Sequence, residues 1–200
     1  MEDDLRRSQI ITINGIGSLF VTKFGIGIIG AGLDYWFSKK EGENIDLDEY
    51  IIKDEWRLAR TCNVRHFKIP PDFRPPTIFS RETVNINIKL PYLRFPTWHF
   101  CQNRKCANMR QFSPTTSDMY LRCHKCNGIM VQVPLISMCP DGHLDEFPYR
   151  EWIERSCHKE DPERKKSHNM IKFIHTGGEG VSGYMIKCEC GAFRSLNGSL

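Results

Sequence analysis

The chain has 200 residues, of which 40% are hydrophobic and 26% are charged. This is the composition of a globular protein, and it excludes an intrinsically disordered chain. The length suits one compact domain or two small ones. The formal net charge is +4, and zinc-bound cysteine thiolates would bring it to about zero, so net charge gives no argument for nucleic-acid binding.

Eight of the nine cysteines lie beyond residue 100, and only Cys62 precedes them. An odd number of cysteines is untypical of a disulfide-bonded secreted protein. The first residues, MEDDLRRSQIITING, lack the apolar core and the small-residue cleavage site of a signal peptide. We therefore expect a cytoplasmic protein whose thiols are reduced and mostly bound to metal.

Residues 15–33 are apolar over about the length of a membrane span. They read GIGSLFVTKFGIGIIGAGL, with Lys23 near the middle and six glycines, which lower helix propensity. Short apolar runs split by glycine favour two buried strands joined by a turn. We therefore expect no membrane association, and we expect the backbone to pack closely around Gly15 and Gly17.

The segments that follow predict a helix and a strand before residue 97. Residues 45–64 have apolar side chains at helical spacing, with an acidic start and a basic end that suit the helix dipole. Residues 67–79 carry two proline pairs and must be extended. Residues 83–90, TVNINIKL, alternate polar and apolar side chains, as a strand with one buried face does. A domain boundary is expected near residue 97, where the cysteines begin.

Four cysteines form two short pairs: Cys101 with Cys106, and Cys123 with Cys126. The first pair encloses four residues, the second encloses two, and sixteen residues separate the pairs. Each pair predicts a tight turn, and two such turns facing each other bring four thiolates to one tetrahedral zinc ion. Asn127-Gly128 supplies the positive φ that the second turn requires. His124 is expected to be exposed and not a ligand.

Five further residues are candidates for a second zinc site: Cys139, His143, Cys157, Cys188 and Cys190. The last two form a C-x-C turn that glycine follows, and Pro-Asp-Gly between the first two predicts another turn. A tetrahedral ion needs four ligands, so one of the five is spare, and His143 is the first that we would omit.

No catalytic signature accompanies these ligands. A catalytic zinc keeps an open coordination position, whereas here the cysteines suffice to close the shell. The sequence lacks the zinc-deaminase pattern, H-E-x-x-H and a phosphate-binding loop. Asp145 and Glu146 precede a predicted helix over 147–156 and are expected to cap its positive end. We therefore expect structural zinc, no enzymatic activity and no small-molecule substrate; the alternative is a metal-dependent hydrolase or nuclease that uses His143, Asp145 or His168.

A local basic face is the remaining argument for DNA binding. Its candidates are Arg6, Arg7, Arg104, Lys105, Arg110, Arg122, Lys125 and Arg194. Trp98 and Tyr120 are available to stack on bases, but we favour Trp98 packing beneath the ribbon and the arginines being solvated. Arg194, just after the C-x-C turn, is expected either to contact phosphate or to brace the thiolates.

Four motifs follow one another along the chain: RRSQIITINGIGS at 6–18, RFPTWHFC at 94–101, MCPDGHLDEFPYREW at 138–152 and CECGAFRSL at 188–196. Together they resemble the N-terminal region of the DrmB family, the helicase-associated protein of the DISARM bacterial anti-phage system. The segment WRLARTCNVRHFKIPP at 56–71 is also similar to that family. The resemblance implies a non-enzymatic partner of a DNA translocase or helicase, with the family's zinc-binding cysteines at the positions named above. Family members usually continue for several hundred residues beyond this region.

These observations predict an α+β protein with a mixed α/β segment over 1–97, a zinc ribbon over 98–137 and a second zinc-binding module over 138–200. Two Zn²⁺ ions are expected. The expected function is that of a zinc-binding component of an anti-phage complex, which docks on a helicase-like subunit and helps to engage DNA. The alternative is a purely structural zinc scaffold for protein–protein assembly.

Overall fold

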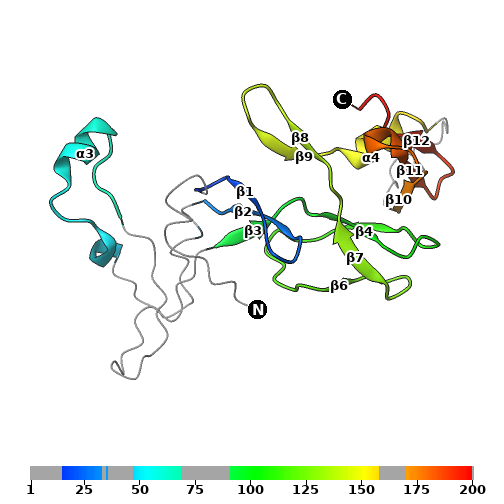
Figure 1. Ribbon diagram of the computed structural model, residues 1–200, viewed down its shortest axis with the longest axis horizontal. Coiled ribbons are helices and arrows are strands. Elements are labelled where there is room, and N and C mark those ends of the chain that lie inside the picture. The colour runs from blue at the N-terminus through cyan, green and yellow to red at the C-terminus, as the bar shows by residue number, and fades with distance from the viewer. Residues whose placement is uncertain (1–14, 33–34, 36–46, 69–90, 158–169, 200) are drawn as a thin grey trace, which may run out of the picture. The chain divides into compact units, whose positions relative to one another are not determined.

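A computed structural model describes residues 15–32, 35, 47–68, 91–157 and 170–199. This part of the chain is mostly β, with several antiparallel sheets and two short helices (Figure 1). It forms two compact units. One holds residues 21–27 and the described residues from Arg94 onward, and the other holds residues 15–20 and the described residues of 28–93.

Residues 15–32 contain the two predicted strands joined by a turn. They are β1 (Leu19–Val21) and β2 (Gly27–Gly30), and β3 (Tyr92–Arg94) completes a sheet in the order β1-β2-β3. The turn between them places Gly25 at φ 74°, a conformation that glycine adopts without strain. The strands are less buried than predicted, because Leu19 and Val21 are exposed.

Close backbone packing near Gly15 is confirmed. A Cβ atom at Gly30 would lie 2.7 Å from the carbonyl oxygen of Gly15, so only glycine fits there. Within the described ranges, no helix has the length and apolar character needed to cross a membrane.

The single helix predicted over 45–64 is wrong, because the described residues 47–64 form two short helical pieces. The first is the 3-10 turn η1 (Leu47–Tyr50), and the second is α3 (Trp56–Thr61), in which Ala59 is buried. Asp54 (φ 68°) and Asn63 (φ 52°) adopt left-handed conformations on either side of α3, and these interrupt a helical hydrogen-bond ladder. The proline-rich segment from residue 69 and the strand predicted over 83–90 lie outside the described residues.

The cysteine-rich part begins with a four-stranded antiparallel sheet in the order β5-β4-β7-β6. Its strands are β4 (Trp98–Cys101), β5 (Met109–Gln111), β6 (Leu121–Arg122) and β7 (Ile129–Gln132). Phe100 of the central strand β4 pairs with Met109 on one side and with Val131 on the other. Strands of two to four residues make few ladder hydrogen bonds, so the sheet needs support from other contacts.

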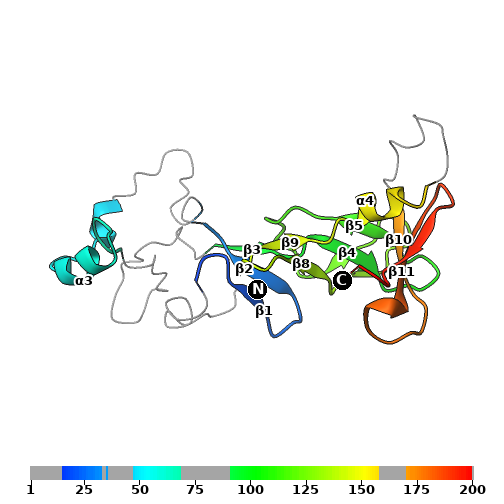
Figure 2. The same cartoon turned by 90° about the horizontal axis from the view of Figure 1, so that it is seen from above.

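The rest of the chain forms a hairpin, a helix and a second antiparallel sheet. The hairpin consists of β8 (Ile136–Met138) and β9 (Leu144–Glu146), and the helix is α4 (Tyr149–Glu154). The sheet consists of β10 (Ile171–His175), β11 (Tyr184–Cys188) and β12 (Phe193–Ser195). A 3-10 turn, η2 (Gly180–Gly183), precedes β11. Strand β10 contacts β5, and α4 contacts β11 and β12 (Figure 2). The Phe173 N–H donates to the carbonyl of Ala107 (2.9 Å), which ties this sheet to the ribbon.

One buried core joins the two cysteine-bearing parts. It contains Trp98 and Met109 of the ribbon together with Tyr149, Ile153 and Phe173 of the C-terminal part. The rings of Trp98 and Tyr149 meet edge to face with their centroids 5.7 Å apart, a favourable aromatic geometry. The expectation that Trp98 packs beneath the ribbon is therefore confirmed.

The helix predicted over 147–156 is confirmed as α4, but the prediction that Asp145 and Glu146 cap it is wrong. The residue at the N-cap is Pro148, and no side chain caps the helix. Asp145 and Glu146 belong to β9. The Glu146 carboxylate instead accepts hydrogen bonds from the backbone N–H of Thr97 and from Nε2 of Gln111 (3.1 Å), so it fastens the hairpin to the ribbon.

Arg194 of β12 contacts Trp152 of α4. Its guanidinium lies 3.7 Å from the centroid of the indole ring and donates from Nη1 to the Trp152 carbonyl (3.1 Å). The side chain therefore holds α4 on the C-terminal sheet, which differs from both roles that the sequence predicted for it.

Substitution Arg194→Ala should lower the free energy of unfolding by about 1–2 kcal/mol, because it removes a cation–π contact and a charge-assisted hydrogen bond. Urea unfolding followed by tryptophan fluorescence measures this loss. Lys187→Ala, at an exposed side chain of the neighbouring strand β11, is the matched control and should change stability little. Loss of zinc from Arg194→Ala without a change in stability would support bracing of the thiolates instead.

Candidate metal centre

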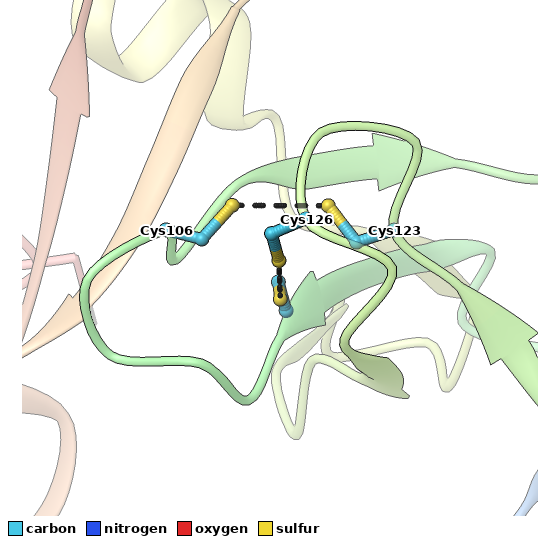
Figure 3. Close-up of side chains that lie close together, drawn as sticks. Cys106, Cys123 and Cys126 are labelled. Carbon is cyan, nitrogen blue, oxygen red and sulfur yellow. Dashed lines mark hydrogen bonds between the residues drawn. The ribbon is translucent and has the colours of Figure 1, made fainter.

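Four cysteine sulfurs meet in the ribbon, as their spacing predicts. The Sγ atoms of Cys101, Cys106, Cys123 and Cys126 all lie within 4.8 Å of one another. The sulfurs of Cys101 and Cys126 are 3.4 Å apart, and those of Cys106 and Cys123 are 3.8 Å apart (Figure 3). Four Zn–S bonds of about 2.3 Å in a tetrahedron place the sulfurs roughly 3.8 Å from one another. The four residues therefore fit a single zinc ion.

The first cysteine pair is held by a turn between β4 and β5. The Cys101 N–H donates to the Asn108 carbonyl (2.9 Å), and the Ala107 N–H donates to the Asn103 carbonyl (2.8 Å). Ala107, directly after Cys106, adopts φ 48°. The backbone N–H groups of Asn103 and Asn108 hydrogen-bond to the sulfurs of Cys101 and Cys106. Such N–H donors stabilise the thiolate form that a metal requires.

The second pair repeats this arrangement. The Cys123 N–H donates to the Gly128 carbonyl (2.9 Å), and the Asn127 N–H donates to the Cys123 carbonyl (2.8 Å). Asn127, directly after Cys126, adopts φ 56°, so the predicted left-handed residue is confirmed at Asn127. The two turns thus present their sulfurs through equivalent hydrogen bonds, as expected of two facing metal-binding turns.

Gly128 is required for a different reason. A Cβ atom at this position would lie 2.9 Å from the Cys101 sulfur and 3.3 Å from the Cys126 sulfur. Any larger residue would therefore push two of the four ligands apart.

The environment of the sulfurs differs from one cysteine to the next. Burial raises the pKa of the Cys101 thiol to about 12, and the neighbouring cysteines add to this rise. The backbone N–H of Gly128 and the thiol of Cys101 lower the pKa of Cys126 to about 7. Cys101 and Cys123 are buried with Leu121 and Met130, whereas Cys126 is exposed. An ion at this centre would lie at the edge of a small core.

The five candidates for the second site fall into two groups. The hairpin turn between β8 and β9 carries one group, in which the Cys139 sulfur lies 3.2 Å from Nδ1 of His143 and Asp141 is adjacent. The Cys139 N–H donates to the His143 carbonyl (3.1 Å), and Gly142 takes φ 83°. This confirms the predicted turn.

The other group is at the end of α4 and at the turn between β11 and β12. Burial raises the pKa of Cys188, and the thiols of Cys190 and Cys157 add to the rise. Across the residues that the structure covers, groups of three or more ligand residues with their ligand atoms within 4.8 Å of one another occur only in the four-cysteine cluster and in the group of Cys139, Asp141 and His143. The structure therefore does not bring the five candidates into one shell.

The candidate DNA-binding arginines and lysines differ in their exposure and in their contacts. Arg104, Lys105, Arg110, Arg122 and Lys125 are all exposed. Lys125 forms an ion pair with Glu189 (2.7 Å) across to the C-terminal sheet, and Arg194 is engaged with Trp152. Arg6 and Arg7, like His168, lie outside the described residues. His124 and Tyr120 are exposed.

Sequence reasoning missed a buried arginine at the end of β3. Arg94 donates to the carbonyls of Asp118 (2.6 Å) and Thr116 (3.3 Å), and its Nη1 lies 3.5 Å from Nε2 of the buried His99. Burial lowers the pKa of His99 to about 4, so the ring is neutral beside the guanidinium. No local pattern marks this network, because its members are up to 24 residues apart.

The fold and the site define a small β-rich protein with a ribbon whose four-cysteine cluster fits a zinc ion. The chain belongs to the family described as Domain of unknown function (DUF8724), whose model matches residues 6–200. It is also distantly homologous to the DISARM protein DrmB of Bacillus paralicheniformis, with 30% identity over 118 residues. That alignment covers 56% of this chain and 20% of the relative, so the chain corresponds to a small part of the relative's length. No solved structure matches the chain.

Replacing one ligand should remove the ion from the ribbon. Elemental analysis of the purified Cys123→Ser protein is expected to show one zinc fewer per chain than wild type, because three thiolates and a hydroxyl bind zinc far more weakly. Cys62→Ser is the matched control, since Cys62 is exposed and its loss should leave zinc content unchanged. An unchanged zinc content in Cys123→Ser would contradict the assignment.

Proposed function

We propose that the chain is a non-enzymatic, zinc-binding component of a DISARM-type bacterial anti-phage system, acting in the cytoplasm. The observation that carries the proposal is its homology to the DISARM protein DrmB. In this proposal the chain docks on a helicase-like subunit and helps to engage DNA. Because the homology covers 20% of that relative, these partners are inferred for this chain and rest on the resemblance of its motifs.

The ligand set supports a structural role for the metal. Four cysteines complete a tetrahedral shell without an open position for water or substrate. Glu146 is engaged with Thr97 and Gln111, so this acidic residue braces the fold. These observations favour a non-enzymatic protein over a hydrolase or nuclease built on His143 and Asp145.

A second zinc ion is part of the proposal. Cys188 and Cys190, on either side of the turn between β11 and β12, would be two of its ligands, and Cys157 beyond α4 is a third candidate. Zinc analysis of Cys190→Ser and of His143→Ala separates the two groups of candidates. If only Cys190→Ser loses one zinc ion, the second site is formed by the cysteines near the β11–β12 turn. If His143→Ala loses an ion, the turn between β8 and β9 supplies a ligand.

The defence role predicts a phenotype. In bacteria that carry the complete gene set of the defence system, Cys123→Ser should restore phage plaque counts to those of a strain that lacks this chain, because the ribbon unfolds without its metal. Cys62→Ser should keep protection. If Cys123→Ser protects as well as wild type while its zinc is lost, the metal-stabilised ribbon has no part in defence.

DNA engagement is supported by the exposed basic side chains of the first metal-binding turn. Arg104 and Lys105 project from the turn that carries Cys106, and each phosphate contact adds about one unit to the salt dependence of binding. The double variant Arg104→Ala/Lys105→Ala should bind DNA more weakly and lower the slope of log K against log salt by about two. Fluorescence anisotropy over a salt series measures this, with Lys187→Ala as control.

The second candidate function is a zinc scaffold for protein–protein assembly. It is favoured by the internal contacts of Lys125 with Glu189 and of Arg194 with Trp152, which remove two cations from the basic set. A wild-type protein that shows no salt-dependent DNA binding would support this scaffold.

A further inference from the structure

The turn between β8 and β9 gathers three metal-binding side chains outside the four-cysteine cluster. They are Cys139, Asp141 and His143, and their ligand atoms all lie within 4.8 Å of one another. The Cys139 sulfur is 3.2 Å from Nδ1 of His143. A zinc ion with a Zn–S bond of about 2.3 Å and a Zn–N bond of about 2.0–2.1 Å places two such atoms roughly 3.6 Å apart in a tetrahedron. The turn therefore holds the sulfur and the nitrogen close to the spacing that an ion requires.

The backbone of the hairpin fixes this arrangement. The Cys139 N–H donates to the His143 carbonyl (3.1 Å), and the Gly142 N–H donates to the Cys139 carbonyl (2.9 Å). Met138 pairs with Leu144 directly outside the turn, so Cys139 and His143 continue two paired strands at neighbouring positions. Gly142 adopts φ 83°, which a residue with a side chain would adopt only with strain. An ion would thus meet ligands that the turn has already positioned.

The donor atoms identify the class of cation. One thiolate sulfur, one imidazole nitrogen and one carboxylate oxygen suit Zn²⁺ and similar transition-metal ions such as Co²⁺. Ca²⁺ and Mg²⁺ instead take oxygen ligands. The Cys139 thiolate and the Asp141 carboxylate together balance the two positive charges of the ion. The turn therefore selects a divalent transition-metal ion over the more abundant hard cations.

The three ligands are open to solvent. Asp141 and His143 are exposed, and Cys139 is half-buried. Among the described residues, no fourth Cys, His, Asp or Glu has its ligand atom within 4.8 Å of all three. Water can therefore take the fourth tetrahedral position, and an ion can enter or leave without unfolding of the hairpin. The four-cysteine cluster differs on both counts, because it has four ligands and two of them are buried.

We propose that the β8–β9 turn is a separate, exchangeable site for a divalent transition-metal ion, which Cys139, Asp141 and His143 bind together. The sequence predicted Cys139 and His143 as members of one shell with cysteines of the C-terminal part, whereas this site is complete within one turn and uses Asp141. The inference goes beyond the proposed function, because it requires neither a second structural zinc ion nor a role in defence.

The test adds Co²⁺ to the full chain, which keeps the zinc with which it was purified. Co²⁺ is the probe because a thiolate ligand gives this ion a strong charge-transfer absorption in the near ultraviolet. Wild type should gain this absorption, and an excess of Mg²⁺ should not remove it. Cys139→Ser should not gain it, since the variant lacks the sulfur. Elemental analysis after the titration checks that the zinc has stayed in place.

The other two ligands are tested by affinity. Asp141→Ala and His143→Ala should each weaken Co²⁺ binding roughly tenfold or more, because each removes one of three ligands. Asp145→Ala is the matched control, since Asp145 is an exposed carboxylate of the same hairpin that does not belong to the group. It should change the affinity less than about twofold.

Three results would overturn the proposal: no absorption in wild type, absorption retained in Cys139→Ser, or equal weakening by Asp141→Ala and Asp145→Ala. Cys190→Ser separates this site from the second zinc ion of the proposed function, and it should gain the absorption as wild type does. Absorption lost in Cys190→Ser but not in Cys139→Ser would place the ion at the β11–β12 turn, which overturns this inference and leaves the proposed function intact. Thermal midpoints without added metal are measured for every variant, and Cys139→Ala replaces Cys139→Ser if the latter does not fold.

Discussion

The convergence of four cysteine sulfurs is the constraint on which the ribbon depends. Its strands have two to four residues, and its own buried cluster consists of Cys101, Cys123, Leu121 and Met130. So small a core supplies little hydrophobic stabilisation. A structural zinc ion contributes roughly 10–16 kcal/mol in small peptides, which exceeds the stability of most domains. A zinc ion bound by the four cysteines would therefore stabilise this sheet more than its own small core does.

The central strand β4 transmits this constraint to the rest of the protein. Successive side chains of a strand point to opposite faces. Trp98 and Phe100 accordingly pack in the core shared with the C-terminal part, while His99 contacts Phe112 and Cys101 belongs to the metal cluster. Directly after Cys106, the Ala107 carbonyl accepts the Phe173 N–H of β10. Both faces of one short strand are thus committed, which explains why the C-terminal sheet is built against the ribbon.

Features that depend on neighbouring residues could be predicted from the sequence, whereas contacts between residues far apart in the chain could not. The spacing of the cysteines predicted the metal cluster, and Asn127 predicted the left-handed turn, because both depend on a few adjacent residues. The prediction of a single helix over 45–64 was wrong, because the spacing of apolar residues does not show that Asp54 and Asn63 adopt positive φ. The role of Glu146 was also missed, because its partner Thr97 is 49 residues away.

Strand β4 links the four-cysteine cluster to the core shared with the C-terminal part. Trp98 at the start of this strand packs in that core, and Cys101 at its end belongs to the cluster. The pairing of β4 with β5 and β7 fixes both residues relative to each other. Glu146 adds a second tie, because it holds β9 to the N–H of Thr97. A zinc ion bound by the four cysteines would therefore stabilise the strand that carries Trp98 as well as the two turns that carry the sulfurs.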